Sequence, residues 1–96
     1  MRKIPDEIRE KIIAILTGYG AVKISIFGSF ARGEERPDSD IDIIVRFKQP
    51  KSLIQLIGIE EEVKMAIDRN IDLLTENSIS PYLVEAIRRD EVVIFG

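Results

Sequence analysis

The sequence contains no cysteine, no histidine and no tryptophan. A chain without thiols and imidazoles forms no disulfide, no Cys/His zinc site, no thiolate nucleophile and no imidazole base. It also lacks an apolar run long enough to cross a membrane, and the basic residues of segment 1–6 are not followed by one. Any chemistry must therefore use carboxylates, hydroxyls and cations, and we expect a cytoplasmic protein that does not bind membranes.

An excess of positive charge is also missing. The 14 Lys and Arg against 17 Asp and Glu give a net charge of -3, so no overall positive field attracts a phosphate backbone. Aromatic residues make up only 6% of the chain and form no stacking stripe. We therefore expect no binding to DNA. With 45% hydrophobic residues in 96 positions, the sequence predicts one domain, 1–96, with a real core.

Hydrophobic periodicity predicts alternating helices and strands. Apolar residues at helical spacing predict a helix over 5–17, closed by Gly18 and Gly20, and a second helix after Ser52 with residues 53, 56, 59, 63, 66 and 67 on its buried side. Strands are expected at 22–27, 40–47, 70–75 and 92–95, a short helical turn at 29–33 and a last helix at 82–89. This order predicts an α/β (α+β) fold with a mixed sheet of about four strands and helices mainly on one face.

Two aspartates occupy alternate positions in the second expected strand. Asp40 and Asp42 leave the same face of that strand, while Ile41 and Ile43 point into the core. Each carboxylate opposes ionisation of the other, and an oxygen-ligated Mg²⁺ or Mn²⁺ would compensate. The pattern is also typical of a solvated acidic turn, and that alternative stays open. Asp72, in the third expected strand, would complete a two-metal site or would point to water from an edge strand.

The segment after the first expected strand begins with Gly28-Ser29. A turn from a strand into a helix directs N–H groups and a hydroxyl at an anion, and glycine lets a phosphate approach the backbone. Alone, Gly-Ser before a helix is a common turn with an N-cap. Together with the acidic pair Asp40 and Asp42, this turn indicates a binding site for a nucleoside triphosphate.

Together these segments resemble a known two-part signature. Residues 28–33 read G-S-F-A-R-G and, after six residues of loop, residues 39–45 read S-D-I-D-I-I-V. The pattern is similar to that of the DNA polymerase beta nucleotidyltransferase superfamily, and the later I-D-L-L-T at 71–75 resembles the third-carboxylate strand of its small prokaryotic members. Those minimal nucleotidyltransferases (MNT proteins) are about as long as this chain. The resemblance implies their polymerase beta palm-like fold.

The resemblance also implies roles for individual residues. Gly28 and Ser29 would hold the triphosphate of ATP, Asp40 and Asp42 would bind two metal ions, and Asp72 would bind one of them and help deprotonate the acceptor hydroxyl. Arg32 would contact phosphate or hold the turn. Arg36 is a weaker candidate for a phosphate contact, and Glu76 is the first substitute if Asp72 does not belong to the site.

The family further implies a partner. MNT proteins occur with HEPN-domain toxins and move AMP onto a toxin tyrosine, which predicts an adenylyltransferase antitoxin here, with homo-oligomers or hetero-oligomers possible. One alternative is an antitoxin that neutralises its partner by docking alone. A second alternative, a polymerase-like enzyme that acts on nucleic acid, conflicts with the net negative charge of the chain. We expect an open cleft at the C-terminal ends of the first two strands, with Phe30 and Tyr82 as candidate partner contacts or as core residues.

Overall fold

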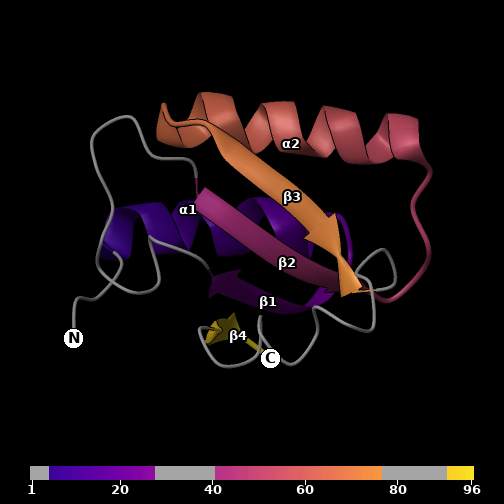
Figure 1. Cartoon of the computed structure of the whole chain (residues 1–96), viewed down its shortest axis with the longest axis horizontal. Coiled ribbons are helices and arrows are strands. Elements are labelled where there is room, and N and C mark those ends of the chain that lie inside the picture. The colour runs from indigo at the N-terminus through magenta and orange to yellow at the C-terminus, as the bar shows by residue number, and fades with distance from the viewer. Residues whose placement is uncertain (1–4, 28–40, 77–90) are drawn as a thin grey trace.

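The computed structural model describes residues 5–27, 41–76 and 91–96. This part of the chain forms two helices and four strands (Figure 1). In chain order the elements are α1 (Asp6–Gly18), β1 (Ala21–Phe27), β2 (Ile41–Phe47), α2 (Leu53–Ile67), β3 (Ile71–Thr75) and β4 (Val92–Phe95). Neither helix is long and apolar enough to cross a membrane.

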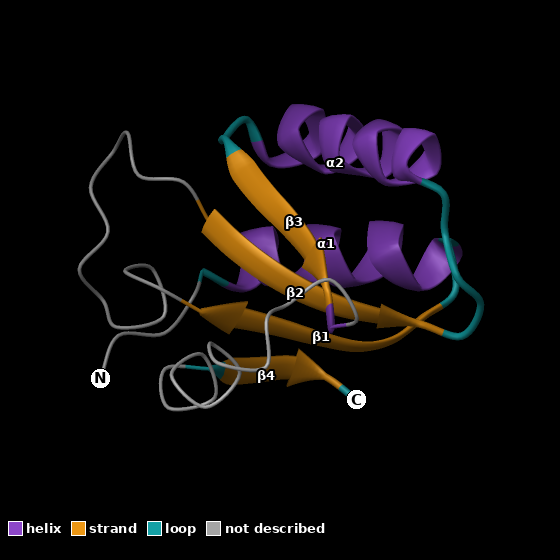
Figure 2. Cartoon of the chain, turned by 45° about the vertical axis from the view of Figure 1, so that its right-hand side comes forward, coloured by secondary structure: helices purple, strands orange, loops and turns teal. Residues whose placement is uncertain are grey.

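The four strands form one mixed sheet in the order β3-β2-β1-β4. Strand β1 pairs antiparallel with both β2 and β4, whereas β2 and β3 are parallel. Both helices lie on the same face of the sheet and pack against each other (Figure 2). The expected fold class is therefore confirmed.

The core lies between this helical layer and the sheet. Alternate strand residues point into it, as a period of two requires. From the strands the core takes Ile24, Ile26, Ile41, Ile43, Val45, Ile71 and Leu73, and from the helices Ile12, Leu16, Ile59, Val63 and Ile67, all of them buried. The intervening strand residues, including Asp42 and Asp72, face away from the helices.

Local signals explain where the helices begin and end. The first turn of α1 carries Asp6 and Glu7, which complement the helix dipole, and the chain leaves α1 through Gly20 at φ 95°. Helix α2 begins with a capping box, in which the Ser52 hydroxyl accepts from the Gln55 N–H and the Gln55 side chain accepts from the Ser52 N–H. These ends agree with the expected helices.

Two sequence-based expectations were wrong. Leu53 was expected on the buried side of α2 but is 73% exposed, because it lies in the first turn, where α2 extends past α1 (Figure 1). The first two strands were expected to end at the same cleft, but β1 and β2 are antiparallel, so the end of β1 lies beside the start of β2. The expected turn at 29–33 and helix at 82–89, with Phe30 and Tyr82, lie outside the described residues.

Candidate active site

Asp42 and Asp72 occupy matching positions on neighbouring strands. In the parallel pair β2/β3 their Cα atoms are direct partners in the register. Both side chains therefore leave the same face of the sheet, the one opposite α1 and α2. Asp42 is half-buried and Asp72 is exposed. The sheet thus brings together two carboxylates separated by 30 positions in the sequence.

The position of each aspartate is set by its buried neighbours. Ile41 and Ile43 flank Asp42 and are fully buried, and Ile71 and Leu73 flank Asp72 and are also buried. A slip of one residue in either strand would move two apolar side chains out of the core, which fixes the register. The N–H of Ile41 also donates to the carbonyl of Asn70 at 3.1 Å, so the two strands start level.

A carboxylate from α2 secures the outer edge of β3. Glu60 Oε2 accepts a hydrogen bond from the Leu73 N–H at 3.1 Å, directly beside Asp72. Lys64 Nζ lies 3.2 Å from Glu60 Oε1 and 3.6 Å from Glu61 Oε1. The hydrogen bond to Glu60 is the main reason why the pKa of Lys64 is raised. The lysine therefore stays protonated and neutralises the acid that holds the edge strand.

Phe27 borders the carboxylate pair on its other side. It ends β1 and is the register partner of Asp42, so Phe27, Asp42 and Asp72 form a row across three strands. Phe27 directly precedes Gly28, the first residue of the candidate phosphate segment, in the sequence. Sequence reasoning missed this half-buried ring, because its place depends on the antiparallel pairing of β1 with β2.

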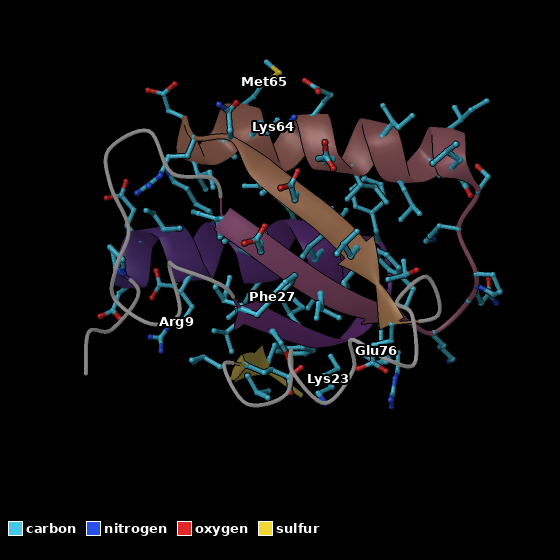
Figure 3. All side chains as sticks on the ribbon, in the orientation of Figure 1. Arg9, Lys23, Phe27, Lys64, Met65 and Glu76 are labelled. Atoms are coloured by element: carbon cyan, nitrogen blue, oxygen red, sulfur yellow. The ribbon has the colours of Figure 1, made fainter. Side chains whose placement is uncertain are left out.

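The opposite end of the same face carries a charged cluster. Arg46 binds Glu76 Oε2 through Nε at 2.9 Å and through one terminal nitrogen at 2.6 Å. Lys23 lies 3.8 Å from Glu76 and 4.0 Å from Glu91. Figure 3 shows Lys23 and Glu76 together at this end of the sheet, away from Phe27. Glu76 is thus at the wrong end of β3 and is paired with Arg46, so it is no substitute for Asp72.

The other expected site residues, Gly28, Ser29, Arg32, Arg36 and Asp40, lie outside the described residues. Among residues 5–27, 41–76 and 91–96, no group of three or more acidic side chains is placed to hold a metal ion. The donors of Asp42 and Asp72 are carboxylate oxygens, which suit Mg²⁺ or Mn²⁺, and a cation between them would offset their repulsion. The two described acids therefore fit part of the expected metal site.

Comparison with known proteins matches this arrangement to one family. The family described as "Polymerase beta, Nucleotidyltransferase" matches residues 10–96. A protein of Methanocaldococcus jannaschii named "Putative protein adenylyltransferase MJ0435" is 44% identical over 87 residues, which cover 91% of this chain and 94% of the relative. The protein adenylyltransferase MntA of Thermococcus cleftensis is 32% identical over 93 residues, covering 88% of this chain and 94% of the relative.

A solved structure gives the same result for the fold. A crystal structure of a toxin-antitoxin with AMP-PNP superposes with a TM-score of 0.84 at 27% identity, covering 92% of this chain and 73% of that chain. The resemblance drawn from the two-part signature is therefore confirmed.

Proposed function

We propose that this chain, which belongs to the polymerase beta nucleotidyltransferase family, transfers AMP from ATP to a hydroxyl of a toxin protein and so acts as its antitoxin. The observation that carries the proposal is the register of Asp42 with Asp72 on the face of the sheet opposite α1 and α2. Relatives named protein adenylyltransferase and the toxin-antitoxin structure with AMP-PNP support the reaction, the nucleotide and the kind of partner. The finer assignment, a tyrosine of a HEPN-domain toxin, rests on the family resemblance.

The reaction is a displacement at the α-phosphate of ATP. The acceptor oxygen forms a bond to that phosphorus, the bond to the β-phosphate oxygen breaks, and pyrophosphate leaves. Asp72 takes the proton of the acceptor hydroxyl, which suits its exposed position beside Asp42. Gly28 and Ser29 hold the triphosphate through N–H groups and a hydroxyl, with Arg32 as a further phosphate contact.

Asp40, Asp42 and Asp72 are the proposed metal ligands. Mg²⁺ or Mn²⁺ bound there would neutralise charge on the reacting phosphate and on its leaving group. The fixed register matters for this role, because carboxylates held by the sheet need little reorganisation to receive a cation. The proposal also includes action in the cytoplasm as one domain, 1–96, with no binding to DNA.

The test is transfer of label from α-labelled ATP to a purified HEPN-domain toxin. We expect transfer that requires Mg²⁺ or Mn²⁺ and that falls by orders of magnitude in Asp42→Asn and Asp72→Asn. Glu10→Gln removes the same charge from the exposed side of α1 and should transfer at the wild-type rate. Equal transfer by Asp72→Asn and wild type would remove Asp72 from the site.

The alternative function is neutralisation by docking alone. It predicts that Asp42→Asn protects cells from the toxin as well as wild type does, with no AMP on the toxin. Two acids kept in register on one face of the sheet favour catalysis, since their repulsion destabilises a chain that uses neither.

A further inference from the structure

The outer side of α2 exposes apolar residues in its first half. Leu53, Ile54 and Ile57 are 73%, 83% and 54% exposed. Single exposed apolar residues are normal on protein surfaces, but three within five positions of one helix form a patch. Helix α1 differs, because its exposed side carries charged residues such as Arg9, which binds Asp6 at 3.0 Å.

Gly58 lies in the same stripe, four residues after Ile54. A Cβ atom at this position would have nothing within 4 Å, so no internal contact requires a glycine there. Glycine inside a helix costs about 1 kcal/mol relative to alanine. Because glycine has no side chain, it leaves a shallow gap between isoleucines on the helix surface. The backbone of another helix can approach closely at this gap.

A pocket of about 370 Å³ lies at the same end of the molecule, where β2 leads into α2. It is lined by residues 45–51, Thr75 and Glu76. Arg46 in its wall is neutralised by Glu76, whereas Lys48 and Lys51 have no ion-pair partner in the part of the chain that the structure describes. Lys51 Nζ lies 5.5 Å from the centre of the Phe47 ring. This corner therefore places two positive charges next to the exposed apolar residues at the start of α2, on a chain of net charge -3.

We infer that the face formed by Leu53, Ile54, Ile57 and Gly58, called here the α2 face, docks an apolar helix of the toxin whose neighbouring acidic side chains pair with Lys48 and Lys51. This inference rests on the proposed function for the identity of the partner. Gly58 admits the helix, the isoleucines pack beside it, and the two lysines set its orientation through complementary charge.

The α2 face lies away from the carboxylate pair, so docking of the toxin and transfer of AMP use different parts of the chain. Lys48 follows the last residue of β2 and lies six residue steps beyond Asp42, a span of roughly 20 Å. A toxin held at the α2 face therefore leaves the carboxylate pair open to ATP and to an acceptor hydroxyl. Binding then does not depend on whether the acceptor is already modified.

The test measures affinity for the toxin used as acceptor in the AMP-transfer assay, with three variants of this chain. Ile57→Glu should weaken binding by about 30-fold or more, the loss typical of a central interface residue. Met65→Glu is its matched control, because Met65 is 81% exposed on the same helix but lies beyond the α2 face (Figure 3), and it should bind within about 3-fold of wild type. Gly58→Leu should raise the melting temperature yet weaken binding by about 10-fold or more.

Other outcomes would overturn the inference. Wild-type affinity in Ile57→Glu and Gly58→Leu would show that the toxin binds elsewhere, and equal losses in Met65→Glu would show that any added charge on α2 weakens the complex. A dimer of this chain that Ile57→Glu dissociates would assign the α2 face to a second copy, and RNA binding lost in Lys48→Glu would assign the corner to a nucleic acid. Labelled AMP transfer to the toxin is scored separately, so the reaction can fail while the docking surface stands, or the reverse.

Discussion

Removing the charge of Asp72 should stabilise the protein when no metal is bound. Asp72 and Asp42 are register partners on strands about 4.8 Å apart, and both leave the same face. Two unit charges at that separation in a largely aqueous setting repel by about 0.5 to 1 kcal/mol once salt screening is included. We therefore expect Asp72→Asn to raise the melting temperature by roughly 2 to 8 °C in metal-free buffer of low ionic strength.

The assay is thermal unfolding followed by circular dichroism, with EDTA and then with Mg²⁺ and ATP. Glu10→Gln changes the net charge equally but removes a solvent-exposed carboxylate of α1, and it should leave the melting temperature nearly unchanged. The gain in Asp72→Asn should shrink in 1 M NaCl, and Mg²⁺ with ATP should stabilise wild type more than the variant. Equal behaviour of the two variants would refute the argument that the carboxylates interact.

Three further predictions concern stability and titration. Leu16→Ala removes a fully buried side chain and should lower the free energy of unfolding by about 2 to 5 kcal/mol in urea titrations, and a loss under 1 kcal/mol would contradict its core position. Ser52→Ala breaks the capping box with Gln55 and should cost about 1 kcal/mol in the same assay. The hydrogen bond to Glu62 raises the pKa of Tyr19, so any stabilisation from this pair is present at neutral pH and is lost as pH rises through the raised value. Ultraviolet titration should show one tyrosine ionising at lower pH in Glu62→Gln, and unchanged curves would contradict the contact.

Much of the fold could be predicted from the sequence because its signals are local. The signals include the capping box at Ser52, the glycines at the end of α1 and the alternation around Asp42, and each acts within a few residues. The expected elements match the described ones closely. The order and direction of the strands could not be predicted, because pairing depends on contacts between distant segments. For that reason the C-terminal ends of the first two strands were expected at one cleft, whereas the end of β1 lies beside the start of β2.

The candidate site was only partly accessible to sequence reasoning. The two-part signature marked Asp42, and a shorter match marked Asp72, but their shared register depends on the parallel pairing of β2 with β3. The cluster of Lys23, Arg46 and Glu76 joins three strands and leaves no pattern in the sequence. The exposure of Leu53 was missed because helical periodicity does not show where the cover provided by α1 ends.

The most direct test of the central claim is the intact mass of the toxin purified after co-expression with this chain. Wild type and Glu10→Gln should yield toxin that carries added AMP, and peptide mapping should locate it on a tyrosine. Asp42→Asn and Asp72→Asn should yield unmodified toxin. Toxin that stays unmodified with wild type yet is still neutralised would contradict the account and leave an antitoxin that acts by docking alone.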